Sequence, residues 1–447
     1  MSAFPIGLHR PVEHPGPLPE RADVVIIGAG IIGVMTAWYL AEKGLRAVVV
    51  EKGRVAGEQS SRNWGWIRQM GRDPAELPIM IEANRMWPDL QAETGEDLGL
   101  VQCGLTYLAQ GQAAMERFQR WLDAVAGSGV DSRLLTADEL RDLMPGCDMP
   151  VVGGLHTPSD MRAEPWIAVP GLARAAMRKG AVIVENCAAR VLDVQAGRVA
   201  GLWTEAGRIA APEVLVAGGA WSSLFLRRHG ITLPQLSVRS SAMATDALPE
   251  VYAGGAADDD LAFRRRQDGG YTLAPSESHE FWVGPDAFRH FRAYLPQLRM
   301  APFGRRYRAM VPRGYPDAWG TRRGWSADEE TPFERMRVLD PAPNMSGLRE
   351  AARRFSRAFP GLGPVAPRAA WAGMIDVLPD EVPVADRAPL PGLSICTGTS
   401  GHGFGIGPGF GRIMADLITG TDPGHDLARF RLSRFSDGTP LQIGPHA

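Results

Sequence analysis

The chain has 447 residues, of which 45% are hydrophobic and 22% are charged, and its formal net charge is -2. This length allows two domains and a large core, and the composition is that of an ordinary globular protein. A nearly neutral chain argues against nucleic-acid binding, which needs a basic field.

At the N-terminus, residues 1–20 are rich in proline and lack the apolar stretch of a signal peptide, so we expect a mobile or surface-draped arm. The cysteines lie far apart and show neither C-x-x-C nor the spacing of metal ligands. This pattern predicts reduced thiols, no metal site and a cytoplasmic location. The four are Cys103, Cys147, Cys187 and Cys396.

Residues 23–51 organise the rest of the chain, because they predict a strand, a glycine turn, a helix and a second strand that ends on an acid. Val24–Ile27 and Ala47–Val50 are short apolar runs, typical of strands buried on both faces. The apolar residues Ile31–Leu40 predict the helix between them.

The glycine turn has the pattern G-x-G-x-x-G. Gly28 makes the tight turn, Gly30 lets the backbone approach a pyrophosphate, and Gly33 lets the helix pack closely on its strand. The free N–H groups and positive end of the helix would face the diphosphate. Glu51 lies 23 positions after Gly28, where a carboxylate can accept both ribose hydroxyls. Together these features predict a dinucleotide site.

A membrane span is the alternative for this stretch, because residues 24–40 are almost wholly apolar. The run is slightly shorter than the roughly 20 residues that a span needs, and its three glycines stand at motif spacing. The dinucleotide turn is therefore the better interpretation.

The middle of the chain predicts a second α/β unit. Val214–Ala217 is a buried strand that ends in the turn 218–221, as expected where a chain returns to its cofactor sheet. Thr136–Glu139 is a capping box that opens a short helix. Further helices are predicted at about 75–93, 113–126 and 166–179, and strands near 104–108, 151–157, 181–185, 189–195 and 198–204.

Residues 233–447 predict strands near 236–245, 271–273, 369–376 and 393–397, and helices at 346–358 and 410–417. The arginine- and proline-rich span 285–343 is too long for a plain loop and is expected to carry short helices. Residues 379–392 are expected to form a loop.

Between the strand at 393–397 and the last helix, seven of the fourteen residues of Gly398–Gly411 are glycine. A run of backbone N–H groups before a helix suits a developing negative charge, such as that at N1 and the C2 carbonyl of a flavin. A flexible linker is the alternative, but it would not lie between a buried strand and an amphipathic helix. For His402 a functional role and a plain packing role remain equally open.

Five motifs resemble the D-amino-acid oxidase superfamily of FAD-dependent oxidoreductases, in its glycine oxidase and sarcosine oxidase beta-subunit-like branch. They are the first turn with Glu51, S-S-R-N-W-G (60–65), A-G-G-A-W-S (217–222), W-A-G-M-I-D-V-L-P-D (371–380) and S-G-H-G-F-G (400–405). The motifs have the order of that family and extend over residues 23–420, although the span 285–343 has no clear counterpart.

The resemblance implies an α/β (α+β) fold with a discontinuous Rossmann-type FAD-binding domain and a substrate domain built on a mixed or antiparallel sheet. We expect an N-terminal arm at 1–20, an FAD-binding domain from 21–90, 156–232 and 366–447, and a substrate domain from 91–155 and 233–365 with its insertion at about 285–343.

The resemblance also implies the residues that hold FAD. They are Gly28, Ala29, Gly30, Ile31, Ile32, Gly33, Glu51, Lys52, Ser60, Ser61, Arg62, Asn63, Trp64, Gly65, Val191, Ala217, Gly218, Gly219, Trp221, Gly373, Gly398, Ser400, Gly401, His402, Gly403, Phe404 and Gly405.

Three departures from the family limit what is carried over. Gly405 stands where sarcosine oxidases have a lysine that helps to hold the substrate carboxylate, and Ile375 stands where glycine oxidase has its carboxylate-binding arginine. No cysteine lies near Gly373, so FAD should be bound non-covalently. Arg68 is the remaining candidate to anchor an anionic substrate, and an arginine paired with a surface acid is the alternative.

The expected activity is oxidation of the C–N bond of an amine or amino acid to an imine, by hydride transfer to flavin N5. The substrate would be a secondary amine, a glycine- or sarcosine-like compound or a D-amino acid, and oxygen or another acceptor would reoxidise the flavin. Arg68 and His402 are the candidate catalytic residues. The oligomeric state stays open, and no nucleic-acid or membrane partner is expected.

Two alternatives remain. The first is a nicotinamide-dependent dehydrogenase, because the first turn alone does not distinguish the two cofactors. The second is a flavoprotein subunit that relays electrons within a larger complex.

The lysines bear on oxygen reactivity. In the sarcosine oxidase branch a lysine over the flavin promotes attack by oxygen, but this chain has only Lys43, Lys52 and Lys179. None lies in residues 180–447. Either an arginine or His402 replaces that cation, or oxygen is a poor acceptor, so slow reoxidation is expected.

Overall fold

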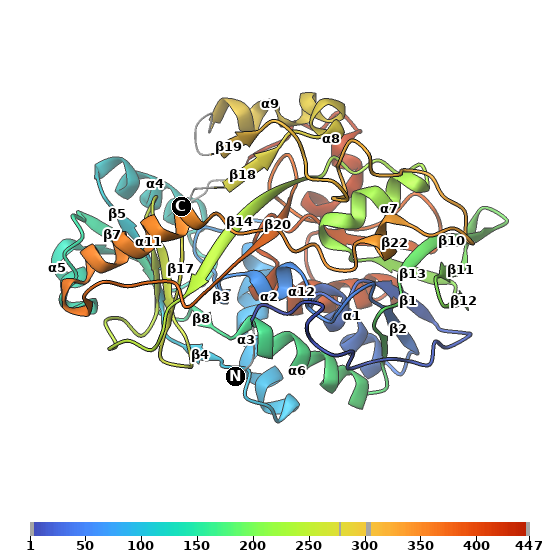
Figure 1. Cartoon of the computed structure of the whole chain (residues 1–447), viewed down its shortest axis with the longest axis horizontal. Coiled ribbons are helices and arrows are strands. Elements are labelled where there is room, and N and C mark those ends of the chain that lie inside the picture. Colours follow the sequence, from blue (N-terminus) through green and yellow to red (C-terminus); the bar gives the residue numbers. More distant parts are fainter. Residues whose placement is uncertain (1–3, 277–278, 301–304, 444–447) are drawn as a thin grey trace.

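The computed structural model describes residues 4–276, 279–300 and 305–443, and two large sheets organise them (Figure 1). The first sheet has the order β21-β22-β13-β1-β2-β9, in which every pair is parallel except β21 with β22. Its strands are β1 (Val24–Ile27), β2 (Ala47–Val50), β9 (Val182–Val184), β13 (Glu213–Val216), β21 (Val384–Arg387) and β22 (Leu393–Thr397).

Both faces of this sheet are covered, which explains why its strands β1 and β2 are apolar throughout. Val24 and Ile26 belong to a core shared with helices, whereas Val25 belongs to a second core on the opposite face. The helices of the first face are α1 (Ile31–Glu42), α3 (Leu77–Thr94), α6 (Pro165–Arg178) and α12 (Gly403–Thr419). The second face carries α7 (Ser222–Arg228) and a small sheet of β10 (Ala189–Gln195), β11 (Arg198–Thr204) and β12 (Gly207–Ala210).

The second large sheet has ten strands, in the order β19-β18-β14-β17-β16-β15-β5-β7-β6, with β20 paired to β14. The register of β14 and β20 runs from Leu236 opposite Val377 to Ala244 opposite Ala369, and the pair crosses the middle of the molecule (Figure 1). The strands are β5 (Leu105–Ala109), β6 (Arg133–Thr136), β7 (Gly153–Thr157), β14 (Leu236–Ala244), β15 (Gly255–Ala257), β16 (Ala262–Arg265), β17 (Tyr271–Ala274), β18 (His279–Trp282), β19 (Arg305–Arg308) and β20 (Ala369–Val377).

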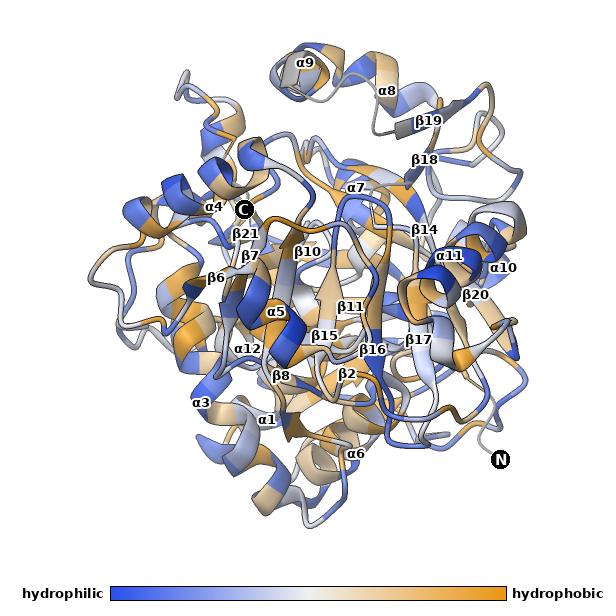
Figure 2. Ribbon diagram, turned by 90° about the vertical axis from the view of Figure 1, so that its left-hand side faces the viewer, coloured by the Kyte–Doolittle hydropathy of each residue, from blue (hydrophilic) through white to orange (hydrophobic). Residues whose placement is uncertain are grey.

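Amphipathic helices cover the second sheet from outside. Helix α11 (Met345–Ala358) buries Leu348 and Phe355 against β16 and β17, while α11 and α5 (Ala137–Leu143) carry hydrophilic residues outward (Figure 2). The capping box of α5 is confirmed, since Thr136 Oγ1 accepts from the N–H of Glu139 and the Glu139 carboxylate accepts from the N–H of Thr136.

Shorter elements complete the chain. A three-stranded sheet of β3 (Trp66–Ile67), β8 (Met161–Arg162) and β4 (Val101–Gln102) was not expected from the sequence. The expected short helices of the 285–343 span are present, although residues 301–304 lie outside the described ranges. The remaining helices are α2 (Gln59–Arg62), α4 (Gln112–Ala124), α8 (Pro285–Arg289), α9 (Phe291–Met300), α10 (Pro332–Arg335), η1 (Gly219–Trp221), η2 (Pro360–Leu362), η3 (Ala428–Phe430) and η4 (Leu432–Phe435).

The predicted start of the last helix is wrong. Helix α12 begins at Gly403, seven residues before the expected start at Phe410, so most of the glycine-rich run is helical. The glycines let this helix approach its neighbours: a Cβ on Gly407 would lie 2.4 Å from the side chain of Ile31, and one on Gly411 would lie 2.4 Å from Met35 Cβ. Close packing outweighs the low helix propensity of glycine.

The predicted loop at 379–392 is also wrong in part. Strand β21 lies within it and pairs with β22 from Val384 opposite Thr397 to Arg387 opposite Ser394. The prolines on either side of β21 suggested a loop, but an edge strand tolerates proline at its ends.

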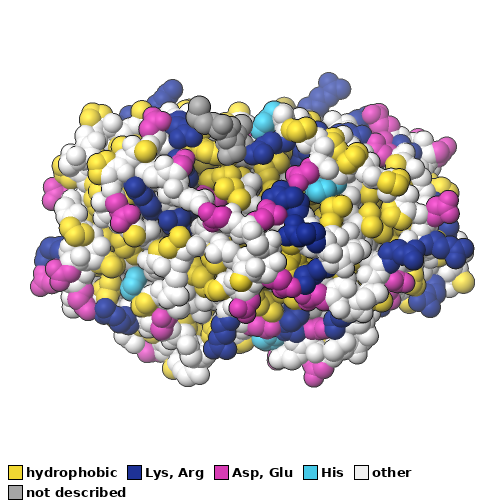
Figure 3. Space-filling view, turned by 90° about the horizontal axis from the view of Figure 1, so that it is seen from below, with side chains coloured by type: hydrophobic (Ala, Val, Ile, Leu, Met, Phe, Trp, Pro, Cys, Tyr) yellow, Lys and Arg dark blue, Asp and Glu magenta, His cyan; other side chains and the backbone are white. Residues whose placement is uncertain are grey.

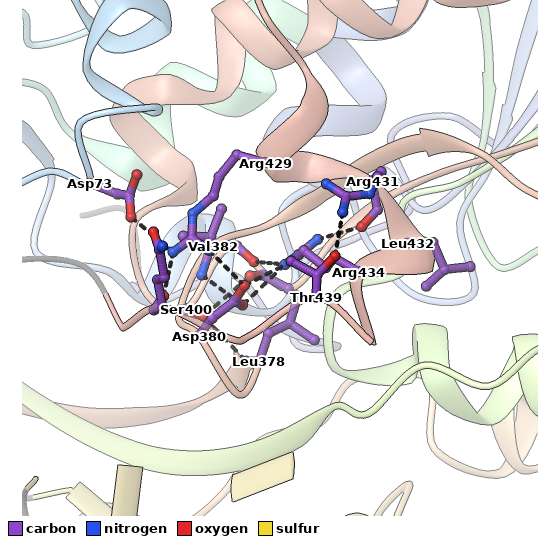
Figure 4. Close-up of polar contacts among 12 residues, drawn as sticks. Asp73, Leu378, Asp380, Val382, Ser400, Arg429, Arg431, Leu432, Arg434 and Thr439 are labelled. Atoms are coloured by element: carbon purple, nitrogen blue, oxygen red, sulfur yellow. Dashed lines mark hydrogen bonds and ion pairs between the residues drawn. The ribbon is translucent and has the colours of Figure 1, made fainter. Parts of the chain in front are cut away.

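The first and last segments that the structure describes both pack on the body of the protein. Ile6 of the N-terminal arm is buried and donates its backbone N–H to Ser61 Oγ at 3.2 Å. Near the C-terminus, the Arg434 guanidinium bonds both carboxylate oxygens of Asp380, at 2.8 and 3.1 Å, and Arg429 pairs with Asp73 (Figure 4).

Acidic and basic side chains are interspersed on the face drawn in Figure 3, in keeping with the nearly neutral chain. Among the described residues, none of the helices combines the length and the apolar character that crossing a bilayer requires. Residues 24–40 divide into β1, the turn and most of α1, so the span alternative is not supported.

Candidate cofactor and substrate site

The first glycine turn has the geometry that the sequence predicts. Gly28 adopts φ +105°, and a Cβ there would lie 2.6 Å from the carbonyl oxygen of Ala217. A Cβ on Gly33 would lie 2.0 Å from the carbonyl oxygen of Gly28, so the helix can contact the turn only without a side chain. These two positions therefore require glycine.

Glu51 is held at the end of β2 by the same turn. Its carboxylate accepts the backbone N–H of Ala29 at 2.9 Å and that of Gly53 at 2.7 Å. Burial raises the pKa of this carboxyl, and the neighbouring Lys52 and the two N–H groups oppose the rise. The geometry places a hydrogen-bond acceptor beside the turn, as binding of a ribose requires.

A cavity extends from this turn to the N-terminus of α12, between the two large sheets. It brings together more than half of the residues that the sequence suggested for FAD. Those on its wall are Gly28, Gly30, Ile31, Ile32, Glu51, Lys52, Ser60, Asn63, Ala217, Gly218, Gly219, Trp221, Gly401, Gly403 and Phe404.

The other suggested residues are not on the cavity wall, and contact with FAD stays a prediction for both groups. They are Ala29, Gly33, Ser61, Arg62, Trp64, Gly65, Val191, Gly373, Gly398, Ser400, His402 and Gly405. Arg62 illustrates the group, because its buried guanidinium bonds the carbonyl oxygens of Ile6, Gly57 and Ala372. Through these hydrogen bonds Arg62 links the N-terminal arm and β20 to the segment around Gly57.

The wall also contains residues that the sequence did not single out. Gln59 comes from α2, Met374 and Asp376 from β20, and Cys396 from β22. A polar residue within the apolar strand W-A-G-M-I-D-V was the available signal for Asp376.

Asp376 is the ionisable group at the α12 end of the cavity. Its carboxylate accepts the backbone N–H of Gly398 at 2.7 Å and the hydroxyl of Thr397 at 3.3 Å. Burial raises the pKa of Asp376 to about 6, although these hydrogen bonds favour the ionised form. The carboxyl therefore titrates close to neutral pH.

Neither Arg68 nor His402, the two candidate catalytic residues, is among the residues of the cavity wall. The Arg68 guanidinium donates to the carbonyl oxygen of Met70 and lies over the ring of Tyr107, 5.4 Å from its centroid. His402 is the N-cap residue of α12, and its neighbours Gly401 and Gly403 line the cavity. The surface-acid alternative for Arg68 is not supported by these contacts.

Each of the three lysines forms an ion pair with an acidic side chain. Lys52 Nζ bonds Glu58 at 2.6 Å and lies over the ring of Trp221, on the cavity wall near Glu51. Lys43 pairs with Asp416, and Lys179 pairs with Glu42 and Glu93. None of the lysines lies at the α12 end of the cavity.

The fold and the cavity define a class of protein. A parallel sheet whose first strand leads through a glycine turn into a helix, followed by an acid at the end of the second strand, is the dinucleotide-binding arrangement. The cavity at the first glycine turn fits a dinucleotide, because the wall at Gly28 and Gly30 has no side chains and Glu51 offers a hydrogen-bond acceptor.

The chain belongs to the FAD-dependent oxidoreductase family, which matches residues 23–417. The same match favours FAD over a nicotinamide cofactor.

The chain is similar to several known proteins. It is 29% identical to the L-amino acid deaminase of Proteus myxofaciens, whose structure was solved in complex with anthranilate; the TM-score is 0.90 over 95% of this chain and 96% of that one. It is 24% identical over 429 residues to the sarcosine oxidase subunit beta of Rhodobacter capsulatus, over 94% of this chain and 90% of the relative.

Mitochondrial sarcosine dehydrogenase of Mus musculus is 30% identical over 240 residues, which are 52% of this chain. That match spans only 26% of the relative, so the relative is much longer than the shared part.

Proposed function

We propose that this protein oxidises the C–N bond of an amino acid or a related amine with FAD as the hydride acceptor. The observation that carries the proposal is the cavity itself, which joins the Gly28 turn and Glu51 to the N-terminus of α12. The resemblance to an amino acid deaminase and to a sarcosine oxidase subunit supports the same reaction class.

In this proposal the backbone of residues 28–32 holds the diphosphate of FAD and Glu51 holds the adenosine ribose. Bound FAD supplies the acceptor for a hydride that leaves the carbon beside the amine nitrogen. The N-terminus of α12 stabilises negative charge, and the apolar wall around Met374 and Phe404 excludes water.

The substrate carries a carboxylate, and Arg68 is the residue proposed to anchor it. The structure of the deaminase was solved in complex with anthranilate, an aromatic acid with an amino group beside its carboxylate. This complex supports a substrate that carries both an amino group and a carboxylate. L-amino acids therefore join glycine, sarcosine and D-amino acids as candidate substrates.

The flavin is bound without a covalent bond. Cys396 is the cysteine on the cavity wall, but it is fully buried and burial raises the pKa of its thiol well above the ordinary value. A protonated, buried thiol is a poor nucleophile.

The experiment that tests the function is anaerobic mixing of the purified protein with single candidate substrates while the flavin absorbance is followed. The panel contains L- and D-amino acids, glycine, sarcosine, imino acids and polyamines. Bleaching by an amino acid supports the proposal.

A second candidate is an electron-relay subunit, which the match to a sarcosine oxidase subunit favours. Co-purification of a second polypeptide, together with no bleaching by any amine, would support it over the first.

A further inference from the structure

Arg72 joins the loop after β3 to the N-terminus of α12. Its guanidinium donates from Nε to the carbonyl oxygen of Arg68 at 2.9 Å and from Nη2 to the carbonyl oxygen of His402 at 3.1 Å. Only 2% of the Arg72 side chain is exposed. A guanidinium presents several donors in a fixed plane, so one side chain can fix both backbone segments.

The charge of Arg72 lies beside the wall of the cofactor cavity. His402, which accepts one of its hydrogen bonds, is flanked by the wall residues Gly401 and Gly403 and is the N-cap residue of α12. Helix N-termini carry partial positive charge, and a buried cation at the same place adds to it. Burial and the charge of Arg68 lower the pKa of Arg72 to about 10, so the guanidinium stays protonated at neutral pH.

The carboxylate of Glu76 lies close to both Arg72 and His402. Its Oε2 lies 3.7 Å from Arg72 Nη1 and 3.7 Å from His402 Nδ1, and 1% of its side chain is exposed. Solvent screens charges weakly in such a buried position, so both groups act on the cavity over longer distances than surface charges do.

We propose that Arg72 is a positioning residue that fixes the His402 turn and raises the electron affinity of the bound flavin, and that Glu76 moderates this effect. The inference rests on the proposed FAD site and deepens it. Negative charge develops on the flavin as it is reduced, so a fixed cation beside the N-terminus of α12 stabilises the reduced form and a fixed anion destabilises it.

The test measures the two-electron reduction potential of bound FAD against a reference dye in the wild-type holoprotein and in Arg72→Met, Arg72→Lys and Glu76→Gln. Arg72→Met is expected to disfavour reduction about tenfold, a decrease of about 30 mV. Glu76→Gln is expected to move the potential upward, and Arg72→Lys to restore most of the wild-type value.

The reduction potential should shift in opposite directions in Arg72→Met and Glu76→Gln, which distinguishes a charge effect from simple damage to the fold. Shifts in the same direction, or no shift in either variant, overturn the proposal, and an unchanged potential in Glu76→Gln alone overturns the role of that residue. If Arg72→Met fails to fold, Arg72→Gln takes its place, because glutamine keeps hydrogen-bond donors without the charge, and a wild-type potential in that variant overturns the proposal.

The matched control is Arg266→Met. Arg266 is equally buried and bonds the carbonyl oxygens of Tyr271 and Thr245 in the second sheet, away from the cavity wall. Its removal should cost stability without moving the potential, and an equal shift in this control would overturn the assignment to Arg72. Wild-type protein that lacks FAD would instead contradict the proposed function.

Discussion

The carboxylate of Asp376 accepts the backbone N–H of Gly398 at 2.7 Å, and this hydrogen bond joins the two large sheets at the cavity. Asp376 belongs to β20 of the ten-stranded sheet, whereas Gly398 directly follows β22 of the six-stranded sheet. The junction thus includes a buried acid, whose protonation state should affect the stability of the fold.

We expect Asp376→Asn to change how stability depends on pH. The folded-state pKa of about 6 lies above the ordinary value of 3.8, so the folded protein binds more protons than the unfolded chain between these pH values. Wild-type stability should therefore fall as pH rises from about 4 to about 6, by about 3 kcal/mol from this group. The asparagine variant lacks that contribution.

Urea unfolding at several pH values measures this difference. Asp259→Asn, at an exposed carboxylate, is the control and should follow the wild type. Parallel pH profiles for the wild type and Asp376→Asn would show that Asp376 does not titrate in this range.

Gly30→Val should give folded but colourless protein. A Cβ on Gly30 would lie 3.1 Å from Ser60 Oγ, and the branched side chain would project into the cavity where the diphosphate is expected. We expect FAD affinity to fall at least 100-fold, or about 3 kcal/mol, by equilibrium dialysis. Gly111→Val is the control, because a Cβ there meets open space; equal flavin loss in both variants would argue against a local effect.

Acid precipitation should release intact FAD into the supernatant and leave a colourless pellet. Cys396→Ser should behave in the same way and keep its flavin, because the protonated thiol forms no bond with it. Flavin that stays with the precipitated wild-type chain would contradict non-covalent binding, and its loss in Cys396→Ser would identify Cys396 as the point of attachment.

Arg68→Lys should raise KM for a carboxylate substrate at least tenfold and leave FAD bound. A lysine keeps the charge but loses the bidentate geometry of the guanidinium. Arg117→Lys is a close control, since Arg117 also lies over an aromatic ring, that of Phe118, but is partly exposed. An unchanged KM would remove Arg68 from the substrate site and direct attention to residues 305–308.

Reduced protein should react slowly with oxygen. No lysine lies at the α12 end of the cavity among its wall residues, so a lysine like the one that promotes attack by oxygen in the sarcosine oxidase branch is missing there. Stopped-flow mixing with oxygen gives the second-order rate constant. If His402 serves as the cation, His402→Gln should lower that constant about tenfold, whereas Lys43→Met should not. A fast wild-type reaction that is unchanged in His402→Gln would refute both expectations.

The cofactor half of the fold could be predicted well because its signals are local. The bounds of β1 and β2 and the position of Glu51 follow from short apolar runs and fixed offsets from Gly28. Resemblance over five motifs then supplied just under half of the residues on the cavity wall, and the family match confirms the FAD-dependent oxidoreductase assignment.

The rest of the fold and of the candidate site depends on contacts between residues far apart in the sequence, which local sequence patterns do not encode. The helical start of α12 depends on how closely Gly407 approaches Ile31, and β21 depends on pairing with β22. Asp376 and Arg72 reach their places through pairing and packing of segments far apart in sequence, so neither stood out as part of the site. The domain boundaries expected from the sequence stay a prediction.

The late position of β22 and α12 in the chain has a consequence for biosynthesis. Strand β22 lies beside β13 in the first sheet, and α12 covers α1 and supplies one end of the cavity. During translation β1, β2 and α1 emerge long before β22 and α12, so their apolar surface is exposed to solvent until these later elements have been made. Cofactor capture therefore follows synthesis of α12, and truncation of the chain before residue 393 should yield aggregated, colourless protein.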